Sequence, residues 1–179
     1  ARWNQYYFGG APADVLGLPS RDVEIDAEIG ILAAWEVPAA DSTTGRWAIL
    51  VHGRGARREE CLRAVPVLHE LGYTALIPLY RNDIGAPSSS DGRYSLGLSE
   101  WRDLEAALLY AVGEGAHEIV RFGWSMGSAS ILPALGPSCT PDRDTDGALA
   151  APGFTRGDVW PQPRPRNTRP RLLSSANGR

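Results

Sequence analysis

The stretch "FGWSMGSASILPALG", residues 122–136, decides how the rest of the chain is interpreted. It overlaps the predicted strand "HEIVRFGWS" and contains Gly123-Trp124-Ser125-Met126-Gly127, which matches the pattern G-x-S-x-G. This spacing belongs to a tight turn between a strand and a helix, because small residues on both sides of the serine let neighbouring backbone approach closely. We therefore predict that Ser125 lies at the tip of such a turn with its hydroxyl exposed.

Strand-like and helical patterns alternate upstream of this turn. The apolar run at 47–51 is typical of a strand that is buried on both faces, and the stretches 73–80 and 117–125 are further predicted strands. The segments between them, 59–72 and 99–113, carry apolar residues at helical spacing. This alternation predicts an α/β fold with a mostly parallel sheet and right-handed crossovers.

Local signals refine this prediction. The alternating stretch 23–37 predicts a hairpin, which we expect at an antiparallel edge of the sheet. Ser99 is the expected N-cap of the helix over 99–113. Pro66 either kinks the helix over 59–72 or marks its true start.

A second glycine-rich turn, His52-Gly53-Arg54-Gly55, ends the first of the parallel strands. In a G-x-S-x-G site the N–H of the residue after the serine, here Met126, points toward the oxyanion that forms on a substrate. The other donor comes from an upstream loop, and the flexible backbone of this turn allows the N–H of Arg54 to supply it. A plain glycine-rich connection is the alternative interpretation.

These pieces together resemble the α/β-hydrolase fold family, in its peptidase-like and esterase-like branch of serine hydrolases. The matching stretches are "WAILVHGRG" (47–55), "LGYTALIPLYRN" (71–82), "WRDLEAALLYA" (101–111) and "IVRFGWSMG" (119–127). The resemblance implies a Ser-His-acid hydrolase of esters or amides with Ser125 as nucleophile and the N–H groups of Met126 and Arg54 as oxyanion donors. The supporting motif positions are His52, Gly53, Gly55, Gly123, Trp124 and Gly127.

The sequence departs from the family pattern after the serine. The family order is Ser, then Asp or Glu, then His, but His52, His69 and His117 all precede Ser125. Without a histidine to accept the serine proton, we expect this chain to be inactive or crippled as an enzyme. The alternative is a non-catalytic, truncated remnant or binding module, whose sheet would have an open edge that favours aggregation.

The amino-acid composition also changes after the G-x-S-x-G turn. Seven of the 14 prolines lie at or after Pro137, and residues 159–179 contain five arginines and no acid. We expect residues 1–136 to form the N-terminal half of an α/β-hydrolase domain and residues 137–179 to be a Pro/Arg-rich, disordered tail. A truncation or a reading-frame shift after Gly127 is our hypothesis for the change.

Composition limits the partners. The chain has 179 residues, of which 43% are hydrophobic and 22% charged, and a net charge of −3. An acidic chain argues against nucleic acid as a partner, although the basic tail leaves a polyanion as an alternative. No apolar run approaches the roughly 18 residues that a membrane span needs, and no signal peptide is visible, so a cytoplasmic location is the default expectation.

The expected partner is therefore a small acyl substrate or a peptide, with the oligomeric state left open. No metal-ligand spacing and no phosphate-binding loop occurs, so we expect no metal and no cofactor. The polar loop over 81–97 is a candidate wall of the substrate pocket, with Tyr80, Arg81 and Tyr94 as candidate lining residues. A plain surface loop is the alternative.

Overall fold

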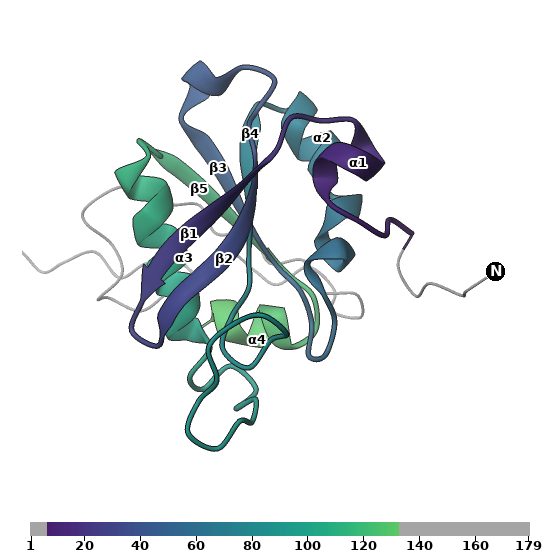
Figure 1. The fold of residues 1–179 in the computed structure, drawn as a ribbon. Helices are drawn as coiled ribbons and strands as arrows, with labels where there is room; N and C mark the ends of the chain where they lie inside the picture. Colours follow the sequence, from purple (N-terminus) through teal and green to yellow (C-terminus); the bar gives the residue numbers. More distant parts are fainter. Residues whose placement is uncertain (1–6, 133–179) are drawn as a thin grey trace, which may run out of the picture.

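Five strands form one mixed sheet in the computed structural model, which describes residues 7–132 (Figure 1). Their order across the sheet is β1 (Arg21–Ala27), β2 (Gly30–Val37), β4 (Tyr73–Pro78), β3 (Arg46–Val51) and β5 (Glu118–Gly123). Strands β3, β4 and β5 are parallel, and β3 lies between the other two. The burial of β3 and β4 on both faces agrees with their largely apolar sequences.

The first two strands form the predicted antiparallel hairpin. Ile25 lies opposite Leu32, and β1 has no second neighbour in the described sheet, so it forms one edge. Strand β2 pairs antiparallel with β4 and joins the hairpin to the parallel strands. The predicted α/β class and the antiparallel edge are both confirmed.

Helices cover both faces of this sheet (Figure 1). One face packs against α3 (Trp101–Gly113) and α4 (Met126–Ile131) through Leu104, Leu108 and Ile131. The other face packs against the short helices on the opposite side. These are α1 (Pro12–Leu16), η2 (Arg58–Arg63) and α2 (Val65–Glu70), and a further single turn, η1 (Ser42–Thr44), precedes β3.

The structure decides between the two alternatives for Pro66 and corrects one cap. Pro66 marks the start of α2, since it occupies the first turn, where its missing N–H costs nothing, and the preceding residues form the separate turn η2. Glu100, not Ser99, holds the N-cap position of α3, and no side chain caps this helix. Ser99 is used elsewhere, since its hydroxyl lies 2.5 Å from that of Ser95.

The long connection between β4 and α3 is fastened at both ends. Arg81 donates two side-chain hydrogen bonds of 2.9 and 2.8 Å to the buried carboxylate of Asp103 in α3, and its backbone N–H donates a third of 2.8 Å. Glu100 accepts hydrogen bonds from the N–H groups of Ser95 and Gly97. These buried contacts hold the loop over 81–97 at the end of the sheet where α4 begins (Figure 1).

The structure leaves part of the sequence-based interpretation untested. The predicted disordered tail, residues 137–179, lies outside the described residues, so the boundary near residue 136 stays a prediction. Within residues 7–132 no helix is both long and apolar enough to cross a bilayer.

Candidate active site

Ser125 connects β5 to α4 and has an unusual backbone conformation. Its φ is 52° and its ψ is −116°, and its side chain is exposed although its neighbours Trp124 and Met126 are buried. Such angles are sparsely populated for a residue with a side chain and cost on the order of 1–3 kcal/mol. The surrounding structure must therefore hold the turn in place.

The flanking glycines explain how the turn is held. A Cβ atom on Gly123 would lie 2.4 Å from the backbone nitrogen of Ser128, and one on Gly127 would lie 2.3 Å from the carbonyl oxygen of Val51. No residue with a side chain fits at either position without moving backbone. The G-x-S-x-G spacing thus matches the close approach of α4 to β3 and β5.

The His52–Gly55 turn lies directly against the serine. A Cβ atom on Gly53 would be 3.2 Å from the Cβ of Ser125, a tight contact that glycine avoids. The next residue, Arg54, is exposed, and Gly55 adopts a left-handed φ of 66°. The structure therefore brings the two predicted oxyanion segments together around Ser125.

Only the backbone of Met126 is available to this site. Its side chain is 4% exposed and packs in the core with Ile131. As the first residue of α4, its N–H has no acceptor within the helix. Trp124 is likewise buried, and its N–H donates a 2.9 Å hydrogen bond to the carbonyl of Val51.

A buried polar network fixes the His52 end of the turn. The His52 ring stacks on Tyr80, and its Nε2 lies 3.0 Å from Asp83 Oδ2. Asp83 accepts hydrogen bonds from the N–H of Tyr80 at 2.9 Å and from the hydroxyl of Tyr94 at 3.0 Å. Burial, followed by the Asp83 carboxylate, raises the pKa of Tyr94 to about 12, so this tyrosine remains a donor at neutral pH.

The Gly53 backbone is held from two directions. Its N–H donates a 2.7 Å hydrogen bond to Glu60 in η2, and its carbonyl accepts a 3.0 Å hydrogen bond from the hydroxyl of Tyr80. With both polar groups of Gly53 engaged, the following N–H of Arg54 has a defined direction. Sequence reasoning missed Glu60 and Asp83, because their partners become neighbours only in the folded chain.

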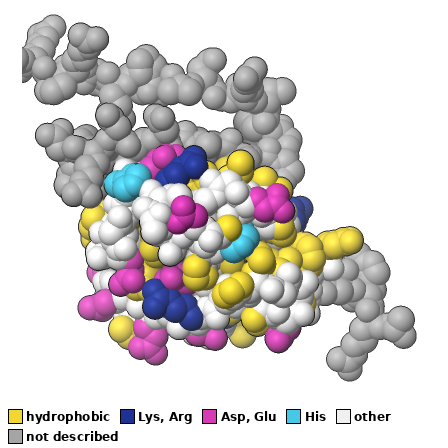
Figure 2. All heavy atoms as spheres, turned by 90° about the horizontal axis from the view of Figure 1, so that it is seen from above, with side chains coloured by type: hydrophobic (Ala, Val, Ile, Leu, Met, Phe, Trp, Pro, Cys, Tyr) yellow, Lys and Arg dark blue, Asp and Glu magenta, His cyan; other side chains and the backbone are white. Residues whose placement is uncertain are grey.

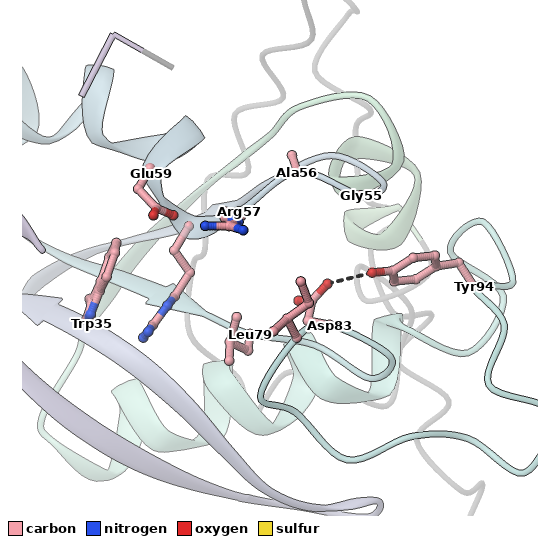
Figure 3. Close-up of a pocket in the computed structure, with 10 residues that line it drawn as sticks. Trp35, Gly55, Ala56, Arg57, Glu59, Leu79, Asp83 and Tyr94 are labelled. Carbon is pink, nitrogen blue, oxygen red and sulfur yellow. Dashed lines mark hydrogen bonds between the residues drawn. The ribbon is translucent and has the colours of Figure 1, made fainter. Parts of the chain in front are cut away.

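A pocket of about 430 Å³ opens beside this turn (Figure 3). Gly55 and Ala56 form one wall, and Tyr94 and Asp83 form another, joined by the hydrogen bond drawn in the figure. The remaining lining residues are Trp35, Arg57, Arg58, Glu59, Leu79 and Ile84. Of the candidate loop residues, Tyr94 lines the pocket, whereas Tyr80 and Arg81 are buried and hold the loop.

The three histidines are all engaged elsewhere or distant from the serine turn. His52 is fully buried, with its Nδ1 3.0 Å from the carbonyl oxygen of Gly53. His69 in α2 has its Nδ1 2.7 Å from the carbonyl oxygen of Pro38. His117 precedes β5, at the end of that strand opposite to Ser125, where its N–H donates to the carbonyl of Gly45.

Charges of both signs are mixed among the described residues at the end of the molecule opposite α4. Figure 2 shows this end from above, with acidic, basic and two histidine side chains interspersed among apolar ones. No group of three His, Cys, Asp or Glu side chains within residues 7–132 is arranged to hold a metal ion.

Solved structures that resemble this chain include hydrolases. An esterase of Pyrococcus furiosus is 26% identical with a TM-score of 0.60, over 73% of this chain and 52% of the esterase. A serine hydrolase without a lid from Xanthomonas campestris is 22% identical with a TM-score of 0.55, over 64% of this chain and 55% of its own. An epoxide hydrolase from an endophytic Streptomyces is 21% identical with a TM-score of 0.54, over 73% of this chain and 36% of its own.

The fold and the turn together define an α/β protein with an exposed serine between a parallel strand and a helix. The described residues have the α/β-hydrolase fold, and the resemblance inferred from the sequence is confirmed at that level. The chain spans about half the length of the esterase and of the serine hydrolase without a lid. No model of a known protein family matches the chain, and no curated protein does.

Proposed function

We propose that this chain carries the nucleophile half of a serine hydrolase that acts on ester or amide bonds. The observation that carries the proposal is the exposed Ser125 at φ 52°, held between two close backbone approaches and against Gly53. In the proposed reaction the Ser125 oxygen attacks an acyl carbon and displaces the alcohol or amine. The N–H groups of Met126 and Arg54 stabilise the oxyanion of the tetrahedral intermediate.

The proposed reaction also needs a base, which the described site does not supply. The serine hydroxyl must lose a proton during attack, and in triad enzymes a histidine accepts it. The sequence has no histidine after Ser125, and the three upstream histidines have the other contacts given above. We therefore expect slow acylation of Ser125 in this chain by itself, supported only by the oxyanion donors.

Labelling of Ser125 by a fluorophosphonate tests this proposal. We expect one slow covalent adduct, mapped by peptide mass spectrometry to Ser125, and none in Ser125→Ala. Added imidazole should accelerate labelling because it supplies the missing base. The matched control is Ser90→Ala, an exposed serine of the loop over 81–97, which should label as the wild type does.

A non-catalytic binding module is the second candidate, favoured by the engagement of His52 in the buried network. Failure of Ser125 to label, with or without imidazole, while the pocket still binds a small molecule, would favour this alternative. Equal labelling of several serines would contradict an activated nucleophile, because ordinary hydroxyls differ little in reactivity.

A further inference from the structure

Arg58 has an unusual environment in the wall of the pocket. Its guanidinium carbon lies 4.0 Å from the centroid of the Trp35 ring, and its side chain is only 17% exposed. Stacking on an indole fixes the plane of the guanidinium and so reduces the entropy lost on binding a ligand. The charge is therefore preorganised at the pocket.

One hydrogen-bond donor of this cation is not used by the described residues. Nη1 of Arg58 is buried and has no hydrogen-bond partner within residues 7–132. Its ion-pair partner there is Asp22, whose Oδ1 lies 4.0 Å from Nη1. That distance is beyond a hydrogen bond, and the Asp22 side chain is 82% exposed.

Leaving a buried charged donor without an acceptor is costly. Burial lowers the pKa of Arg58, against the opposing effects of Asp22, Glu59 and Asp83, but a guanidinium remains charged at neutral pH. An unmet hydrogen bond of a charged group costs more than that of a neutral one. Because Nη1 itself has almost no accessible surface, a ligand in the pocket would meet Arg58 at the exposed part of its side chain. A carboxylate there would add the close counter-charge that Asp22 does not supply.

The other charged groups of the pocket do not supply that acceptor. Asp83 already accepts hydrogen bonds from Tyr80 and Tyr94 and lies against His52. Arg57 and Glu59 contribute one charge of each sign to the lining. The pocket therefore has a stacked, partly buried arginine and, among the described residues, no carboxylate that hydrogen-bonds to its Nη1.

We propose that the pocket binds a carboxylate of the substrate through Arg58, so that the substrates are esters or amides of acids that carry a second, free carboxylate. The substrate part of this inference rests on the proposed function, whereas the carboxylate site does not. Gly53 lies against Ser125, and Gly55 of the same turn lines the pocket, so the pocket adjoins the serine turn. The carbon chain of the substrate would run from the acyl carbon at Ser125 into this pocket.

The remaining walls suit that chain. Trp35, Leu79 and Ile84 provide apolar surface beside the charge. The volume of about 430 Å³ lies in the range of sites for small molecules, which combine apolar walls with a few polar groups. Tyr94 and the Gly55–Ala56 backbone border the same space (Figure 3).

Isothermal titration calorimetry of the full chain tests the carboxylate site. We expect saturable binding of monomethyl succinate and no binding of the neutral dimethyl succinate. Arg58→Gln should weaken binding by about tenfold or more, because a charged hydrogen bond is lost. Arg58→Lys should retain part of the affinity through its charge, and Arg102→Gln, an exposed arginine on α3, should change nothing.

Specific outcomes would overturn the inference. Absence of binding, equal binding of the two esters, or binding unaffected in Arg58→Gln would each remove it. Inorganic phosphate binding as tightly as the monoester would show a general anion site rather than a carboxylate subsite. The comparison of the two esters uses wild-type protein, so it stands even where an Arg58 variant fails to fold.

The same titration separates this inference from the proposed function. Ser125→Ala should bind monomethyl succinate as the wild type does, since the serine does not line the pocket. Arg58-dependent binding without any labelling of Ser125 would leave the carboxylate site in place and defeat the hydrolase proposal. Labelling of Ser125 without carboxylate binding would support the hydrolase proposal and remove the carboxylate site.

Discussion

Glu100 combines complete burial with a full set of hydrogen bonds. Its Oε1 accepts from the N–H of Ser95 at 2.7 Å, and its Oε2 accepts from the N–H of Gly97 at 2.8 Å and the hydroxyl of Ser95 at 2.9 Å. Burial alone would raise the pKa of Glu100, but the hydrogen bonds from Ser95 and Gly97 outweigh it and hold the pKa below 4.5. The folded loop therefore stabilises the ionised form of the Glu100 carboxylate.

This arrangement predicts a pH-dependent effect of Glu100→Gln. At neutral pH the variant should lose about 1–3 kcal/mol of unfolding free energy, because an amide nitrogen replaces an acceptor. Because the pKa of Glu100 is lower in the folded state, its charge stabilises the fold at pH values above the pKa of the unfolded state. This stabilisation is lost as the pH falls through the pKa of the folded state. The difference from the wild type should therefore narrow below about pH 4.

Urea denaturation at a series of pH values measures this difference. The matched control is Glu70→Gln, because Glu70 is exposed at the end of α2. If Glu100→Gln lowers the unfolding free energy by the same amount at acidic and neutral pH, the proposed role of the charge is contradicted.

Single residues also show what a sequence can reveal. Ser125 and its flanking glycines were predictable because the steric demand of the turn lies within five consecutive residues. Asp83 was not, because it meets His52 only when the end of β4 and the end of β3 come together in the sheet. The unpartnered Nη1 of Arg58 could not be predicted from the sequence either, since it depends on which residues surround η2 in the fold.

At the scale of elements, the junction of β5 and α4 leaves no space for a methyl group at Gly127. A Cβ there would be 2.3 Å from the carbonyl oxygen of Val51 and 2.7 Å from that of His52. Gly127→Ala should therefore destabilise the protein by about 1–3 kcal/mol or more, because backbone must move to relieve the overlap.

Thermal unfolding checks this prediction against a second glycine. Gly113 ends α3, and a Cβ atom added there would have nothing within 4 Å, so Gly113→Ala should be neutral or stabilise by up to about 1 kcal/mol. A melting temperature of Gly127→Ala equal to that of Gly113→Ala would show that α4 can shift freely away from β3.

Whole elements were more predictable than their ends. The strands and α3 were expected from periodicity, since burial on one or two faces determines the pattern. The start of α3 was not, because Ser99 bonds with Ser95 in the loop instead of capping the helix. The division into η2 and α2 was likewise open, because a proline can kink a helix or lie in its first turn, and the sequence alone did not decide between these for Pro66.

At the scale of the molecule, β5 forms the second edge of the sheet among the described residues. Strand β5 pairs with β3 on one side, and no described strand pairs with its other side. Val120 and Phe122 on this strand are only partly buried against the second face of the sheet. An edge with unpaired backbone groups and apolar side chains is a template for association with another strand.

We therefore expect the purified chain to self-associate through β5 as its concentration rises. Val120→Lys should reduce this association, because a charge on an edge strand opposes pairing with a second copy. The control is Leu109→Lys, which adds the same charge at an exposed position of α3. Sedimentation velocity over a range of concentrations measures the effect, with circular dichroism to establish that both variants fold. A chain that stays monomeric throughout, or a Leu109→Lys variant that disperses it equally well, would mean that the β5 edge is not the associating surface.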